Sequence, residues 1–138
     1  MIKRLSHVGF LVKDIEGAQK LYEELLGLKL WRHGVLNHPS DGLKNSKMAV
    51  GDTDTDIELM QPSDPNSAIG KALERRGEGV YHLCFITDNL DAELKRLRAK
   101  GIQVVERKPS ATLPNKGAWI SPRSTTGVLI ELVEKPIK

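Results

Sequence analysis

The sequence lacks the features that mark secreted and membrane proteins. Cys84 is the single cysteine among 138 residues, so no internal disulfide can form, which is typical of a reducing compartment. The first residues contain no apolar segment of the kind found in signal peptides. No apolar run approaches the roughly 18 residues that a membrane span requires. We therefore expect a cytoplasmic protein that does not enter a membrane.

Aromatic side chains and excess charge are also scarce. Aromatic residues make up 4% of the sequence, and 21 basic against 18 acidic residues give a net charge of +3. The basic residues do not cluster with aromatic ones, so we do not expect a nucleic-acid partner. A hydrophobic content of 39% is ordinary for a globular protein, and the length suits one domain.

An internal repeat is the strongest pattern present. The sequence His-Val-Gly-Phe at 7–10 matches His-Leu-Cys-Phe at 82–85, and Ile-Glu-Leu at 57–59 recurs at 130–132. The spacing is 82 − 7 = 75 for the histidines and 131 − 58 = 73 for the glutamates. Markers that recur in the same order at similar offsets indicate a duplicated structural unit.

Each copy of the repeat predicts the element order β-α-β-β-β. We expect strands at 5–12, 28–31, 47–50 and 56–60 around a helix at 15–26, then strands at 80–87, 102–105, 118–120 and 128–133 around a helix at 88–100. Residues 33–45 are polar and turn-rich, and we interpret them as a loop or a strand edge. The chain is then one α+β domain, 1–138, with a first module at 1–62, a connecting helix and linker at 63–79, and a second module at 80–138.

Two glutamates stand inside strands that otherwise look buried. A carboxylate in an apolar strand is costly unless it is paired, hydrogen-bonded or bound to a metal. Glu58 and Glu131 each share a repeat with one histidine, His7 or His82. Two imidazoles and two carboxylates suit cobalt, nickel, zinc, manganese or iron, so the four residues are predicted metal ligands.

Several motifs resemble the vicinal oxygen chelate superfamily, and within it the methylmalonyl-CoA epimerase family. They lie at residues 57–62, 64–69, 76–85 and 126–132, and the resemblance covers nearly the whole chain. It implies two βαβββ modules that form a curved, mostly antiparallel sheet around a central divalent metal ion. It also implies a homodimer, since similar proteins commonly form dimers.

The resemblance implies an isomerase that epimerises methylmalonyl-CoA or a related acyl-CoA by removing the α-proton. Glu131 would be both a metal ligand and a proton shuttle. The metal would act as a Lewis acid on a substrate that offers it two oxygens. One alternative is a lyase of the glyoxalase I type, which acts on a glutathione adduct. Another is a metal-free small-molecule (drug) binding protein of the bleomycin-resistance kind, although the four retained ligands argue against it.

Some positions depart from the epimerase pattern. One bacterial form of the family has a catalytic glutamate three residues after the glycine that corresponds to Gly42, and here that position is Asn45. Asp41 is the nearest candidate for a second acid/base. His33 and His38 have no partner in the repeat, so we expect neither to affect metal binding. The segment 111–117 also departs from the family pattern. This difference bears on the identity of the substrate more than on metal binding.

Overall fold

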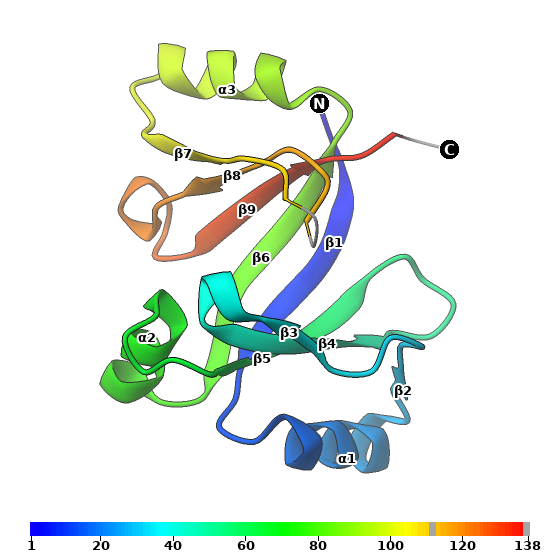
Figure 1. Cartoon of the computed structure of the whole chain (residues 1–138). Coiled ribbons are helices and arrows are strands. Elements are labelled where there is room, and N and C mark those ends of the chain that lie inside the picture. The colour runs from blue at the N-terminus through cyan, green and yellow to red at the C-terminus, as the bar shows by residue number, and fades with distance from the viewer. Residues whose placement is uncertain (111–112, 137–138) are drawn as a thin grey trace. The chain divides into compact units, whose positions relative to one another are not determined.

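The computed structural model describes residues 1–110 and 113–136 (Figure 1). The first half contains β1 (Ile2–Leu11), α1 (Ile15–Leu26), β2 (Lys29–Leu30), β3 (Leu36–His38), the 3₁₀ turn η1 (Pro39–Asp41), β4 (Leu43–Ala49), β5 (Asp56–Pro62) and α2 (Ala68–Arg76). The second half contains β6 (Gly79–Thr87), α3 (Leu90–Ala99), β7 (Val104–Arg107), β8 (Gly117–Ile120), the 3₁₀ turn η2 (Pro122–Ser124) and β9 (Leu129–Glu134).

The chain divides into two compact units. One, called the first module below, contains His7–Tyr81. The other, called the second module, combines Met1–Ser6 with the chain from His82 onward. β1 therefore belongs to both, and the hydroxyl of Thr87 donates a 3.2 Å hydrogen bond to the carbonyl of Met1. This division differs from the module boundaries at residues 62 and 80 that the sequence predicted. The organisation of the chain as a single domain stays a prediction.

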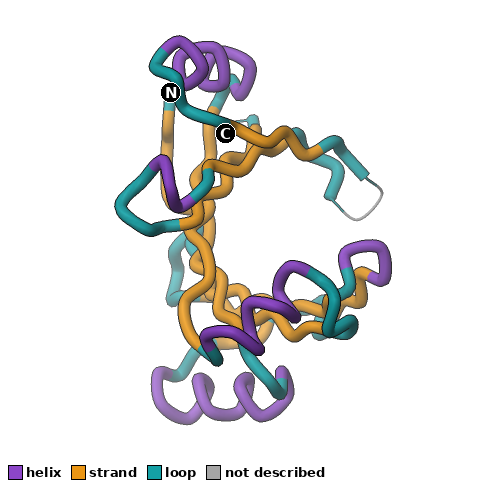
Figure 2. Tube along the Cα trace, turned by 90° about the vertical axis from the view of Figure 1, so that its left-hand side faces the viewer, coloured by secondary structure: helices purple, strands orange, loops and turns teal. Residues whose placement is uncertain are grey.

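In the first module the strands lie in the order β2-β4-β5-β1, with β3 paired to β4. β1 and β5 are parallel, whereas β4 pairs antiparallel with β2, β3 and β5. α1 lies along one face of these strands (Figures 1 and 2). The buried side chains beneath it form the core of the module: Val12, Ile15, Leu28, Met48 and Leu59.

The second module repeats this plan with the order β6-β9-β8-β7. β6 and β9 are parallel, and β8 pairs antiparallel with β9 and β7. α3 lies over its own strands (Figure 2), and its apolar side chains complete a core of Leu90, Leu94, Ala118, Ile120 and Leu132. The α+β class and the two βαβββ units are thus confirmed.

The helix ends show how local chemistry sets the boundaries. α1 ends at Gly27, whose φ of 66° lies in the left-handed region that favours glycine. Asp14 occupies the N-cap of α1, but its side chain makes no capping hydrogen bond, and Gln61 accepts from the backbone N–H of Ile15 instead. α3 begins at Leu90, later than the predicted residue 88, because Asn89 caps it by accepting from the N–H of Ala92 at 2.9 Å.

Residues 33–45 contain more structure than the sequence predicted. β3, η1 and the first part of β4 lie there, and β4 begins at Leu43 rather than at 47. Gly42, with a φ of 65°, reverses the chain between η1 and β4. The short strands and polar residues hide any alternation of apolar residues. Residues 111 and 112, in the segment 111–117 that departs from the family pattern, lie outside the described residues.

No helix among the described residues is long and apolar enough to cross a membrane.

Candidate metal centre

In the first module, His7 and Glu58 form the first predicted ligand pair. His7 on β1 and Glu58 on β5 are 6% and 9% exposed. The Nε2 atom of His7 lies 3.7 Å from Oε1 of Glu58. Parallel pairing places Gly9 opposite Glu58, and Gly9 shares the face of His7 because it is two residues further along the strand. The pair thus follows from strand register.

A polar chain leads from Glu58 to His38, which the sequence did not predict. Asn45 on β4 donates from Nδ2 to Oε2 of Glu58 at 3.0 Å. Its other amide atom, Oδ1, lies 2.9 Å from Nε2 of His38. Since Oδ1 can only accept, Nε2 of His38 must carry the hydrogen. His38 is buried, and its Nδ1 has no hydrogen-bond partner among the residues that the structure describes.

In the second module, His82 and Glu131 form the equivalent pair. They are 2% and 7% exposed, and Nε2 of His82 lies 3.5 Å from Oε2 of Glu131. Cys84 lies opposite Glu131, as Gly9 lies opposite Glu58. The identical register in both modules confirms that the sequence repeat is also a structural repeat.

The surroundings of Glu131 differ from those of Glu58. Arg107 on β7 reaches Oε1 of Glu131 with Nη2 at 3.5 Å. Trp119 on β8 lies opposite Glu131 in the ladder, and its ring meets that of His82 edge-on at 5.2 Å between centroids. Glu131 is therefore flanked by an imidazole, a guanidinium and an indole.

The donor chemistry of each pair fits a divalent metal. Ligand atoms lie about 2.0–2.2 Å from zinc, which puts neighbouring ligands roughly 3.0–3.5 Å apart. The separations of 3.7 and 3.5 Å are close to this spacing and exceed the about 2.7–3.2 Å of a good hydrogen bond. Imidazole nitrogen and carboxylate oxygen suit first-row divalent metals. His7 with Glu58, and His82 with Glu131, could each supply two ligands.

Two other residues considered from the sequence, Asp41 and His33, are exposed. Asp41 ends η1 and is exposed, directly before Gly42. His33 is exposed and stacks on Trp31 at 5.9 Å between ring centroids.

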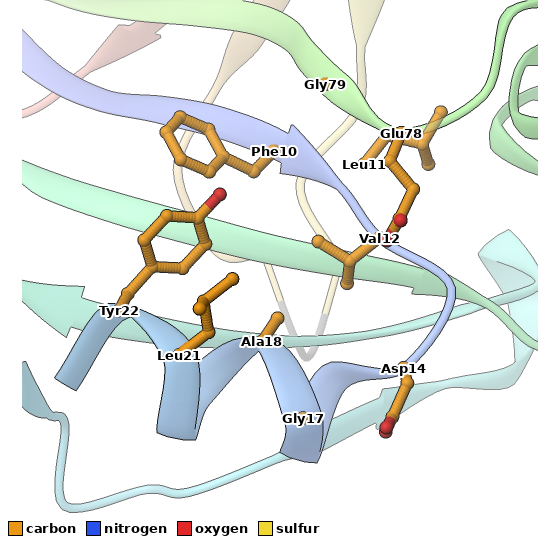
Figure 3. A pocket seen from close by; sticks show the side chains of 10 residues that line it. All are labelled: Phe10, Leu11, Val12, Asp14, Gly17, Ala18, Leu21, Tyr22, Glu78 and Gly79. Carbon is orange, nitrogen blue, oxygen red and sulfur yellow. The ribbon is translucent and has the colours of Figure 1, made fainter. Parts of the chain in front are cut away.

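The first module also contains a cleft of about 450 Å³ between α1 and β1 (Figure 3). Phe10 and Tyr22 line it and contact each other edge-on, with ring centroids 5.4 Å apart. None of the predicted ligands lines this cleft, and neither does Asp41. It is therefore separate from the His7–Glu58 pair.

Comparison with known proteins identifies the family. The profile of the Glyoxalase/Bleomycin resistance protein/Dioxygenase superfamily matches residues 6–118. The chain belongs to this superfamily. The resemblance drawn from the sequence motifs is thus confirmed.

Its similar proteins include several methylmalonyl-CoA epimerases. The human mitochondrial enzyme of that name is 30% identical over 131 residues, which are 94% of this chain and 72% of the human one. The crystal structure of the Mycobacterium tuberculosis epimerase is 34% identical with a TM-score of 0.86, covering 99% of this chain and 90% of that one. A Streptomyces coelicolor epimerase variant in complex with 2-nitronate-propionyl-CoA is 26% identical with a TM-score of 0.87, covering 99% and 100%.

The sequence did not predict the contacts of three polar residues near the glutamates: His38, Asn45 and Arg107. His38 lacks a repeat partner, and no motif marks Arg107. The sequence held one usable signal. Gly117 pairs with Val133 just as Asn45 pairs with Met60, so Asn45 and Gly117 occupy equivalent places in the repeat. A glycine there leaves room for a long side chain from a neighbouring strand.

Proposed function

We propose that the protein is a divalent-metal-dependent epimerase that abstracts the α-proton of methylmalonyl-CoA or a related acyl-CoA. The observation that carries the proposal is the duplicated His–Glu pair, buried at the same strand register in each module. The similar proteins named methylmalonyl-CoA epimerase support the reaction type. The acyl-CoA analogue bound by the Streptomyces coelicolor protein supports the substrate class.

The four residues His7, Glu58, His82 and Glu131 are proposed to hold one ion of cobalt, nickel, zinc, manganese or iron. Such an ion supplies Lewis-acid chemistry, which withdraws charge from the substrate oxygens and makes the α-proton easier to remove. Each module would contribute two of the ligands. Metal binding should therefore need both modules.

Proton transfer is assigned to carboxylates of this chain. Glu131 has oxygens directed at His82 and Arg107, and as a buried carboxylate it can accept a proton from bound substrate. Epimerisation also needs a group that serves the opposite face of the α-carbon. The amide of Asn45 does not titrate at neutral pH, so we assign this second role to Asp41, at the exposed end of η1.

The test is isotope exchange in D2O. Metal-loaded protein incubated with methylmalonyl-CoA should place deuterium on the α-carbon, which mass spectrometry detects. Glu131→Gln should abolish exchange, and Asp41→Asn should lower it by about 10²-fold or more. Glu24→Gln, on the exposed face of α1, is the matched control and should exchange like wild type. An absence of exchange by metal-loaded wild type would exclude the epimerase.

A glyoxalase I-type lyase is the second candidate, because that family also uses two histidines and two glutamates as ligands. Its test is conversion of the methylglyoxal–glutathione adduct by the same metal-loaded preparation. Activity on this adduct without α-proton exchange on the acyl-CoA would favour the lyase.

The family resemblance also leads us to propose a homodimer, which light scattering coupled to size-exclusion chromatography tests. The cytoplasmic location likewise remains a proposal, supported by the buried free thiol of Cys84.

A further inference from the structure

Arg107 lies beside Glu131, a predicted ligand of the second module, and the sequence assigned it no role. Its side chain is 17% exposed, so most of the guanidinium is removed from bulk water. Nη2 lies 3.5 Å from Oε1 of Glu131, whereas His82 approaches the other carboxylate oxygen, Oε2. Arg107 is thus held directly against a proposed catalytic carboxylate.

Gly117 provides the space for this arrangement. It pairs with Arg107 across β7 and β8, and a Cβ built on it would lie 2.6 Å from Nη2 of Arg107. Any larger residue would push the guanidinium away from its present position. At the equivalent place in the first module, Asn45 fills the space and hydrogen-bonds to Glu58. The two copies of the repeat have therefore diverged here: the equivalent position is an asparagine that bonds to Glu58 in the first copy and a glycine that leaves room for Arg107 beside Glu131 in the second.

The guanidinium has unused hydrogen-bonding capacity. Besides the contact with Glu131, Nη1 donates to the carbonyl of Leu113 at 3.4 Å. Nε is buried and has no hydrogen-bond partner among residues 1–110 and 113–136. A guanidinium offers five donors in a planar fork that matches a carboxylate. Two long contacts leave most of this capacity for a bound ligand.

We propose that Arg107 binds the free carboxylate of the substrate's acyl group and so determines specificity. The inference rests on the proposed function and narrows its substrate class to acyl-CoA thioesters that carry a carboxylate on the α-carbon. The guanidinium pairs with the ligand's carboxylate while Glu131, held beside it, faces the α-carbon. Trp119, opposite Glu131 in the ladder and against the ring of His82, supplies an apolar surface beside the glutamate.

A purely structural role for Arg107 predicts something different. If Arg107 only compensates the charge of Glu131, a change that displaces the guanidinium but retains its charge, such as Gly117→Ala, should affect ligands with and without the carboxylate equally. Recognition of the ligand's carboxylate predicts a selective loss. A pair of ligands that differ only in that carboxylate separates the two.

The experiment is calorimetric titration of the metal-loaded full chain with methylmalonyl-CoA and with propionyl-CoA, which lacks the carboxylate. Wild type should bind methylmalonyl-CoA more tightly. Arg107→Met should weaken that binding by about 10- to 100-fold and leave propionyl-CoA unchanged. Gly117→Ala keeps the charge of Arg107 but displaces its guanidinium, so this variant should also show a smaller preference for methylmalonyl-CoA over propionyl-CoA. Lys108→Met removes a neighbouring exposed cation and should change neither affinity.

Thermal unfolding of each variant shows whether it is folded, and Gly117→Ala tests the idea independently should Arg107→Met fail to fold. Three results would each overturn the proposal. Arg107→Met could bind methylmalonyl-CoA and propionyl-CoA more weakly by the same factor, or it could keep the wild-type preference for methylmalonyl-CoA. Wild type could also bind the two thioesters equally well. Isotope exchange tests the reaction separately. If wild type exchanges the α-proton but Arg107→Met still prefers methylmalonyl-CoA over propionyl-CoA as wild type does, this inference alone is rejected. If Arg107→Met selectively loses affinity for methylmalonyl-CoA but wild type does not exchange the α-proton, only the epimerase is rejected.

Discussion

The side-chain amide of Asn45 donates a 3.0 Å hydrogen bond to the carboxylate of Glu58, a predicted metal ligand. The bond occupies Oε2, while Oε1 lies toward His7. Partners of this kind orient a ligating carboxylate, and their loss typically lowers metal affinity by 10- to 100-fold. Asn45→Leu should therefore weaken metal binding by about that factor, as measured by competition with a chelating dye.

The control for this variant is Asn37→Leu, an exposed asparagine on the neighbouring β3, which should bind metal like wild type. Unchanged metal affinity in Asn45→Leu would show that Glu58 needs no support from Asn45, or that Glu58 is not a ligand.

His38 should act on the metal through Asn45. Its Nε2–H fixes which way the Asn45 amide faces, so His38→Leu should lower metal affinity, though by less than Asn45→Leu. His38→Gln retains a donor and should recover part of the affinity. These expectations replace the one drawn from sequence, in which His38 had no influence.

His33 provides the comparison for His38, because it is exposed and stacks on Trp31. His33→Ala should leave metal affinity unchanged. Equal metal affinities in wild type and His38→Leu would mean that the orientation of Asn45 does not depend on His38.

Leu59 should be a major contributor to stability. It neighbours Glu58 on β5, is completely buried, and packs in the core beneath α1. Leu59→Ala should lower the free energy of unfolding by about 2–5 kcal/mol, because it removes buried methyl groups and leaves a cavity. Leu25→Ala on α1, where the side chain is 66% exposed, should change it by less than about 1 kcal/mol. Urea titration followed by circular dichroism measures both, and similar values would contradict this view of the core.

The sequence predicted the His–Glu pairs because two independent signals coincided. Apolar strands made Glu58 and Glu131 conspicuous, and the duplication placed a histidine at the same offset from each. The parallel registers of β1 with β5 and of β6 with β9 then bring each pair together. Hydrophobic pattern determines such registers, because a slip of one residue would turn every side chain to the other face.

The polar neighbours of these pairs could not be predicted in the same way. His38 lies on a three-residue strand and Arg107 ends a four-residue one, and both strands are too short to show a clear alternation. Their contacts also depend on the turn at Gly42 and on the missing side chain of Gly117. Such features arise from tertiary structure, and the two halves of the repeat differ in them.

The number of divalent ions bound per chain tests the central claim most directly. After loading with cobalt or zinc and desalting, elemental analysis of wild type should give about one ion per chain, since the two His–Glu pairs are proposed to share it. His7→Ala and His82→Ala should each lose most of the metal and also the thermal stabilisation that it provides. About two ions per wild-type chain, or full occupancy in both variants, would contradict a single ion held by both modules.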